Sequence, residues 1–186
     1  MSYQLARRLF TVDDYERMCE TGILREDDRV ELIEGEITQM AAMGKRHASC
    51  VDLLNDSLTE QSKRRYIVRV QSSIVLHDLS APQPDIALLV RRKDFYRHQL
   101  PSVEDVLLVI EVSDSSLEYD RRKKLPDYAR AGVPEFWIVN LIEERVEIYT
   151  QPVGGAYERV IYVQPSESLA SVTIPDLTLD SAALLA

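Results

Sequence analysis

The sequence has 186 residues, of which 45% are hydrophobic and 28% are charged, the balance of a globular protein with its own apolar core. The net charge of −9 argues against a protein that coats nucleic acid through an overall basic surface, although it leaves room for a nucleic-acid enzyme with a local basic patch. No apolar run approaches the roughly 20 residues of a membrane span, so we expect no membrane partner and one domain over residues 1–186.

The cysteine usage and the N-terminal segment indicate a compartment. Cys19 and Cys50 do not form a disulfide framework, and no Cys/His spacing resembles a zinc site. We therefore expect both to be reduced thiols in helices. Residues 1–10 contain arginines but no apolar signal core, so we expect a cytoplasmic protein.

The N-terminal part of the chain predicts a helix, a hairpin and a second helix. Thr11 opens the first helix with Asp14 as its capping-box partner, and Gly22 is its expected stop. In "RVELIEGEITQM" (29–40), apolar residues flank a Glu-Gly turn, which predicts a hairpin. Apolar residues at helical spacing predict the second helix over about 45–64.

Strands around one more helix are predicted for the rest of the chain. The helix is expected over 118–131 with Gly132 as its stop, and Pro126 either kinks it or begins a second helix. The last residues predict a strand and a short helix. The expected strands lie at 66–76 (as one strand or a bent pair), 84–90, 105–112, 135–140, 145–150 and 157–163.

Two carboxylates stand at the ends of neighbouring predicted strands. Asp85 opens the strand at 84–90, and Glu111 continues the apolar run of the strand at 105–112. If these strands pair antiparallel, the start of one lies beside the end of the other, and both carboxylates meet at one edge of the sheet. Because Mg²⁺ is usually held by one or two carboxylates with water and phosphate, the pattern predicts a site for Mg²⁺ (or Mn²⁺) on Asp85 and Glu111.

A site of this type also needs a cation, which would hold the attacking water and offset the charge that develops on phosphorus. Ser113 shares a strand face with Glu111 but carries no charge. Lys124 on the following helix could supply the cation. Its neighbour Lys123 would point about 100° away, so we expect only one of the two to face the site.

Several short motifs together resemble the Uma-type restriction endonuclease family, a bacterial group within the PD-(D/E)XK nuclease superfamily. They are "PD" (84–85), "IEVSDSS" (110–116), "DRRKKLPDYARAGVPEFWIVN" (120–140) and "VELIEGE" (30–36), and the resemblance spans roughly residues 11–150. It implies an α/β (α+β) fold with a restriction-endonuclease-like αβββαβ core, in which helices flank a mixed sheet. The N-terminal hairpin and the C-terminal strands would be additions to that core. The resemblance also implies a metal-dependent phosphodiesterase site that acts on DNA.

The resemblance places the catalytic roles on three residues. It makes Asp85 and Glu111 the metal ligands and Lys124 the catalytic cation. Ser113 stands where the superfamily pattern has a lysine. In this family the lysine lies on the helix, and the matching Lys124 comes four residues after Asp120.

Further candidates surround these three. By the same resemblance, Glu31 matches the glutamate ahead of the hairpin glycine and His47 matches a histidine at a helix start. Together with Ser113 and Asp120, they are expected to support the metal ligands or to contact substrate. Asp114 stands where the family usually has proline, which adds a negative charge near the site.

Ordinary structural roles are open alternatives for the same residues. Asp85 could cap a strand, and Glu111 could form a buried ion pair with Arg69 or Arg121. Lys124 could form a common surface pair with Asp120 one helical turn away. The basic clusters 63–65, 91–93 and 121–123 could be solvated faces, but they are also the evident candidates for a phosphate track.

Two functions from different classes follow. The first is a Mg²⁺- or Mn²⁺-dependent endonuclease that hydrolyses DNA phosphodiester bonds, expected to act as a homodimer because one compact unit with one cleft cuts both strands most simply by two-fold symmetry. The second is a catalytically inactive nuclease fold that binds nucleic acid or a partner protein. The negative net charge, Ser113 in the lysine position and the added Asp114 favour this second function.

Overall fold

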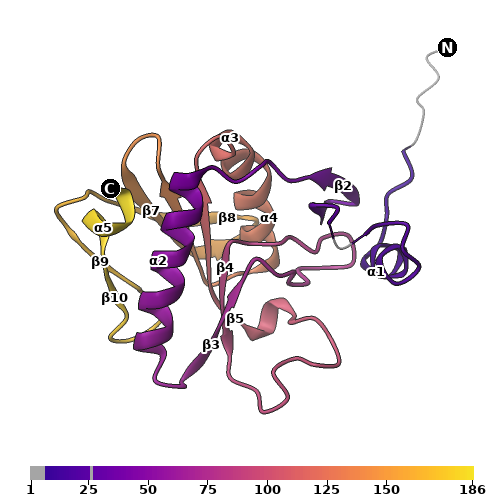
Figure 1. The fold of residues 1–186 in the computed structure, drawn as a ribbon, viewed down its shortest axis with the longest axis horizontal. Coiled ribbons are helices and arrows are strands. Elements are labelled where there is room, and N and C mark those ends of the chain that lie inside the picture. The colour runs from indigo at the N-terminus through magenta and orange to yellow at the C-terminus, as the bar shows by residue number, and fades with distance from the viewer. Residues whose placement is uncertain (1–6, 26) are drawn as a thin grey trace.

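The computed structural model describes residues 7–25 and 27–186, and a six-stranded mixed sheet forms its centre (Figure 1). The spatial order of the strands is β3-β4-β5-β6-β7-β8. All neighbours are antiparallel except β5 and β6, which run parallel. The strands are β3 (Tyr66–Val70), β4 (Ile86–Val90), β5 (Val106–Ser113), β6 (Glu135–Asn140), β7 (Arg145–Val153) and β8 (Ala156–Val163).

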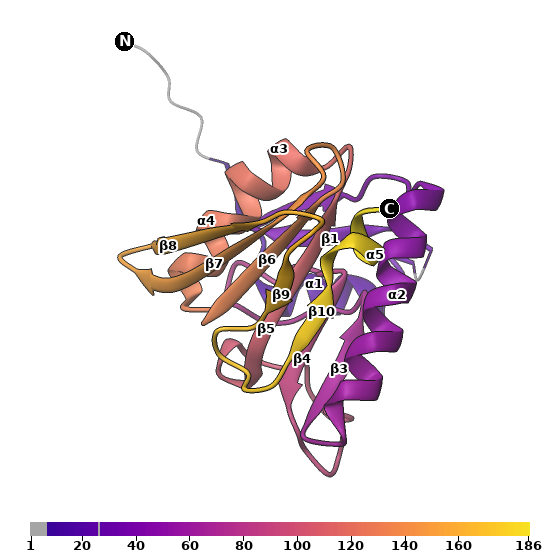
Figure 2. The same ribbon diagram turned by 90° about the vertical axis from the view of Figure 1, so that its left-hand side faces the viewer.

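The parallel pair requires a crossover, and the chain makes it with helical turns on one face of the sheet. These are α3 (Leu117–Tyr119), the π-helical turn η2 (Asp120–Lys124) and α4 (Leu125–Ala131). The longest helix, α2 (Lys45–Ser62), covers the other face together with the short C-terminal α5 (Ser181–Leu185) (Figure 2). The predicted class, a mixed sheet flanked by helices, is confirmed.

Two apolar cores follow from this layering. One packs α2 and the C-terminal segment against the sheet, and the other packs α4 against the opposite face around Tyr128 and Phe136. Every residue of β6 is buried, as expected for a strand covered on both faces. The continuous apolar run of β5 has the same cause. The two cores hold β5 rigidly, and with it the strand end that carries Glu111.

The N-terminal elements form a smaller layer beside the sheet. Helix α1 (Val12–Glu20) begins with the predicted capping box, in which the Asp14 amide donates to Thr11 Oγ1 at 3.1 Å. Strands β1 (Val30–Ile33) and β2 (Glu36–Gln39) form the predicted hairpin. A bridge from Leu32 to Ala81 fixes the hairpin to the segment that precedes β4. This contact brings the hairpin to the edge of the sheet where Asp85 lies.

Three sequence predictions are corrected or refined by the structure. The strand predicted over 66–76 ends at Val70, because Gln71 turns to a φ of 43° and its amide bonds to the Asp85 carbonyl. The helix predicted over 118–131 consists of three contiguous helical segments, with Pro126 in the first turn of the last one, α4. The last residues form two strands rather than one, β9 (Ser168–Ala170) and β10 (Thr178–Asp180), besides α5. A 3₁₀ turn, η1 (Val103–Asp105), leads into β5.

The helices of the described residues include none with the length and apolar character needed to cross a membrane. Cys19 and Cys50 are free and lie in α1 and α2, as predicted.

Candidate active site

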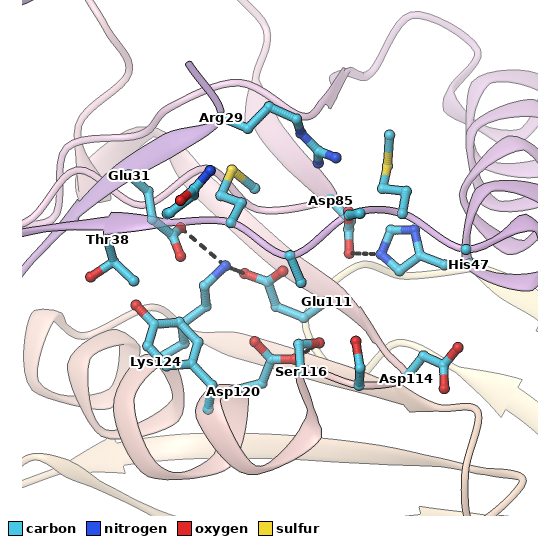
Figure 3. A pocket seen from close by; sticks show the side chains of 18 residues that line it. Arg29, Glu31, Thr38, His47, Asp85, Glu111, Asp114, Ser116, Asp120 and Lys124 are labelled. Atoms are coloured by element: carbon cyan, nitrogen blue, oxygen red, sulfur yellow. Dashed lines mark hydrogen bonds and ion pairs between the residues drawn. The ribbon is translucent and has the colours of Figure 1, made fainter. Parts of the chain in front are cut away.

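A cavity of about 260 Å³ opens where the hairpin, the start of α2, the end of β5 and the π-helical turn η2 meet. Its charged lining comes from residues far apart in the sequence (Figure 3). The residues that line it include every candidate named from the sequence except Ser113: Glu31, His47, Asp85, Glu111, Asp120 and Lys124. Ser113 lies directly behind it, fully buried.

The strand register brings the two predicted metal ligands together. Strands β4 and β5 are antiparallel with Ile86 opposite Ile110, so Asp85 falls beside Glu111. The amide of Val112 donates a hydrogen bond of 2.9 Å to Asp85 Oδ2, which ties the first acid to the strand of the second. Both carboxylates are buried. The predicted convergence at one sheet edge is therefore the observed geometry.

Asp85 is held ionised by its partners. His47 Nε2 lies 3.0 Å from Asp85 Oδ2, and the Gln71 amide donates to Asp85 Oδ1 at 3.2 Å. Burial alone would raise the pKa of Asp85, but the hydrogen bond and charge of His47, with the Val112 amide, lower it overall. Burial lowers the pKa of His47, yet contact with Asp85 raises it overall. The pair therefore favours an Asp85 carboxylate beside an imidazolium.

Lys124 is the cation at the centre of the pocket. Its Nζ lies 3.0 Å from Glu111 Oε1 and 3.1 Å from Glu31 Oε2, and the lysine is 4% exposed (Figure 3). Burial disfavours its charge, but Glu111, Glu31 and Asp120 raise its pKa well above the ordinary value. Lys123 instead points outward, with Nζ 3.6 Å from Glu34. As predicted, only one of the two lysines faces the site.

Glu111 has two donors on one oxygen. Besides Lys124, the Tyr128 hydroxyl donates to Glu111 Oε1 at 2.8 Å. Burial raises the pKa of Glu111 well above its usual range and outweighs Lys124, because Asp120, Asp85 and Glu31 add like charge. The alternative that Glu111 pairs with Arg69 or Arg121 is wrong. Arg69 donates to the Phe95 carbonyl, and Arg121 binds Glu143 and Glu147.

Asp120 and Ser113 form the floor behind the pocket. The hydroxyls of Ser113 and Ser116 each donate to Asp120 Oδ2 at 2.7 Å. Burial raises the pKa of Asp120, and the charge of Asp85 adds to the rise. The alternative of a surface Asp120–Lys124 pair is wrong because both side chains are buried. Ser113 thus positions Asp120 and does not replace the superfamily's lysine as a cation.

Carboxyl groups outnumber cationic groups in the pocket. Four carboxylates, those of Glu31, Asp85, Glu111 and Asp120, face Lys124 and His47. Exposed Asp114 and half-buried Arg29 lie farther out on the lining. The raised pKa values of Glu111 and Asp120 reflect this crowding of carboxyl groups, which a bound cation of higher charge would relieve.

The donor set fits a site for Mg²⁺ or Mn²⁺ that relies on water. Within residues 7–25 and 27–186, no three His, Cys, Asp or Glu side chains are grouped so that they could hold a metal by themselves. Asp85 and Glu111 offer hard carboxylate oxygens, and Mg²⁺ commonly takes one or two of these with water and phosphate. The residues present therefore fit such an ion as a pair of ligands, not as a complete cage.

Three supporting residues were not recognised from the sequence. Tyr128 follows Lys124 by four residues, and this spacing, which places both on one helix face, was the available signal. Gln71 and Gln83 carried no signal, because each lies in irregular chain. Gln71 bonds Asp85, while the Gln83 amide donates to Glu31 Oε2 at 3.1 Å.

Comparisons with known proteins identify a family and a fold. Residues 12–182 match the model of the Uma2 family, described as "Putative restriction endonuclease". Among curated proteins, no sequence matches. A crystal structure from Anabaena variabilis ATCC 29413, described as "a putative nuclease belonging to DUF820", superposes with a TM-score of 0.66 at 17% identity, covering 95% of this chain and 97% of that one. At that identity, the likeness supports the fold alone.

Proposed function

The chain belongs to the Uma2 family, described as "Putative restriction endonuclease", and from this premise we propose that it is a divalent-metal-dependent endonuclease that hydrolyses DNA. The observation that carries the proposal is the meeting of Asp85, Glu111 and Lys124 in one pocket whose carboxyl groups outnumber its cationic side chains. Two converging carboxylates with an adjacent lysine are the groups that phosphodiester hydrolysis needs.

Each residue of the pocket has a role in this proposal. Asp85 and Glu111 would hold Mg²⁺ or Mn²⁺, which when bound lowers the pKa of water and neutralises phosphate charge. His47 orients the carboxylate of Asp85, and Tyr128 orients that of Glu111. Lys124, kept charged by its acidic neighbours, would donate a hydrogen bond to the attacking water and stabilise the charge that develops on the phosphoryl oxygens.

Cleavage of supercoiled plasmid by the purified protein tests the proposal. With Mg²⁺ or Mn²⁺ we expect nicked circles, and with EDTA none. Asp85→Asn should reduce nicking by roughly 10³-fold or more, because a metal ligand is lost without a change in size. Asp52→Asn, on the exposed side of α2, removes the same charge outside the pocket and should leave nicking intact. Nicking by the folded Asp85→Asn protein at the wild-type rate would refute the proposal.

A second candidate is the inactive scaffold, and one observation favours it. Both predicted ligands already have cationic partners, since His47 faces Asp85 and Lys124 faces Glu111. Calorimetric titration with Mn²⁺ separates the two functions. Binding that Asp85→Asn abolishes supports the enzyme, whereas identical heats in the wild type and the variant, together with absent nicking, support the scaffold.

A homodimer remains part of the proposal, because two symmetric copies of this pocket would cut the two strands of a duplex. Light scattering on the purified protein, with and without DNA, measures the number of chains. A monomer in both conditions would leave a nickase as the expected activity.

A further inference from the structure

Two of the three basic clusters of the sequence are brought together by the sheet. Strands β3 and β4 pair antiparallel with Tyr66 opposite Val90, so the turn before β3 adjoins the loop after β4. This end of the sheet gathers seven cationic side chains, which we call the basic end: Lys63, Arg64, Arg65, Arg91, Arg92, Lys93 and Arg97. Residues 60–65 and 91–98 hold the carboxylates of Glu60 and Asp94, and those of Asp105 and Asp176 lie at the same end. The cations outnumber these acids in a chain with a net charge of −9.

Most cations of the basic end lack a carboxylate partner. Among the described residues, Arg92 is the one member that forms an ion pair, with Asp94 at 2.9 Å. The remaining six side chains are exposed. The third basic cluster of the sequence differs. There Arg121 pairs with Glu143 and Glu147, and Arg122 pairs with Glu118. Exposed cations without a carboxylate partner are available to an external anion.

The loop after β4 also presents an aromatic ring on a fixed backbone. Tyr96 anchors the loop, because its ring is buried and its hydroxyl donates to the Val90 carbonyl at 2.7 Å. The preceding Phe95 is 52% exposed, with the Arg91 guanidinium carbon 5.1 Å from its ring centre. Both aromatic residues have positive φ, 52° and 58°, a conformation that non-glycine residues avoid. The loop therefore holds Phe95 outward at a cost in backbone strain.

We propose that the basic end is a second DNA-contact surface, on which unpaired cations bind the phosphate backbone and Phe95 stacks on an unpaired base. The combination of cations and an exposed ring fits nucleic acid better than an acidic protein, because only nucleic acid offers phosphates and aromatic bases in regular alternation. A surface hollow lined by Gln61, Lys63, Arg65 and Asp176 lies at the same end. The choice of DNA as the nucleic acid rests on the proposed function.

This surface is separate from the pocket that holds Asp85, Glu111 and Lys124, which we call the acid pocket. Asp85 precedes the first residue of β4, and Arg91 follows the last. Six residues of extended chain span roughly 20 Å. The basic end therefore cannot touch the phosphate that is cleaved, and it would bind the same DNA molecule at a distance from the cut.

Binding without metal tests the surface independently of cleavage. Fluorescence anisotropy would follow a labelled 20-nucleotide strand and its duplex in EDTA, from 50 to 200 mM salt. The variant Arg91→Ala/Lys93→Ala/Arg97→Ala should bind the single strand at least tenfold more weakly. The slope of log affinity against log salt should fall by about 2, since each lost phosphate contact removes about 0.7. Phe95→Ala should weaken single-strand binding roughly fivefold or more and leave duplex binding unchanged.

The controls distinguish DNA binding by the basic end from nonspecific attraction of DNA to any exposed cation. The variant Arg17→Ala/Arg25→Ala/Arg159→Ala removes the same charge from other exposed positions and should keep wild-type affinity and slope. Equal weakening of both triple variants, no binding by the wild type, or displacement of DNA by polyglutamate at equal charge would overturn the inference. Binding that depends on the basic end in a protein without nicking activity would support it and would refute only the proposed cleavage.

Discussion

The two ends of strands β3 to β5 hold charged groups in different environments. At the end that holds Asp85 and Glu111, the charged groups are buried and bond to one another. At the basic end, the charged groups are exposed, and most have no partner among the described residues. The same strands therefore support two different electrostatic environments about 20 Å apart.

Burial decides whether a charged group suits catalysis or binding. Buried groups interact strongly because water does not screen them, so their pKa values shift and they suit bond-making chemistry. Exposed cations keep their ordinary charge and interact with a polyanion mainly by releasing its counterions. We therefore assign reaction to the acid pocket and affinity to the basic end. The predictions below test that division.

The largest expected effect separates kcat from KM. Glu111→Gln should reduce kcat for plasmid nicking by roughly 10³-fold with little change in KM, because it removes a charge that acts at the reacting phosphate. The double variant Arg91→Ala/Lys93→Ala should raise KM several-fold and leave kcat near the wild-type value. Steady-state nicking at two salt concentrations measures both. A loss of kcat in the second variant would refute the assignment of catalysis to the acid pocket and of binding to the basic end.

A second effect concerns the stability that Lys124 provides. Lys124→Met leaves Glu111 and Glu31 buried without their cation, which should cost about 3–5 kcal/mol in the free energy of unfolding at pH 7. Adding Glu111→Gln should restore part of that loss, because one unpaired charge disappears. Urea denaturation of the single and double variants measures the coupling. Removing Arg91 from the basic end should change stability by less than about 0.5 kcal/mol.

Replacing Lys124 is expected to lower stability as well as activity, unlike replacing an exposed catalytic lysine. On sequence grounds alone, replacing it would abolish cleavage and leave the fold intact. Its burial between two carboxylates makes it a structural residue as well. Full stability of Lys124→Met at pH 7 would mean that water reaches the pocket freely.

The smallest effect is a pH dependence of stability from Asp120. The folded-state pKa of Asp120 is raised, so the folded chain binds a proton more tightly than the unfolded chain. Its contribution to stability is therefore fully present below its unfolded-state pKa and is lost as pH rises through the folded-state value. Asp120→Asn should raise the melting temperature at pH 8 by roughly 2–4 °C and have less effect at pH 4. A variant that melts lower at pH 8 would show that the serine hydrogen bonds outweigh burial.

Much of the fold was predictable because its signals are local. The capping box at Thr11, the Glu-Gly hairpin turn and the apolar run of β5 each depend on a few adjacent residues. The strand that ends at Val70 shows the limit. Residues 72–76 are apolar enough for a strand, but the chain turns at Gln71 to meet the Asp85 carbonyl. No local pattern encodes that long-range contact.

The main residues of the candidate site were predictable from the sequence, but their long-range contacts were not. Asp85, Glu111 and Lys124 were named from strand ends and motif resemblance, and the structure brings all three to one pocket. The contact of Glu31 with Lys124 depends on how the hairpin docks through Leu32, which its sequence does not show. The joining of the basic clusters at 63–65 and 91–93 follows from the pairing of β3 with β4, so a correct strand pairing would have revealed it.

The π-helical turn at Asp120–Lys124 sets a limit on redesign of this protein. Its backbone bond runs from the Leu125 amide to the Asp120 carbonyl, which is one residue more per turn than in an α-helix. Deleting one residue there would remove the extra residue of this turn. It would also rotate Asp120 by about 100° relative to Lys124 and separate two groups of the acid pocket. The extra residue of this turn therefore serves the acid pocket, and a chain shortened there would no longer carry the site.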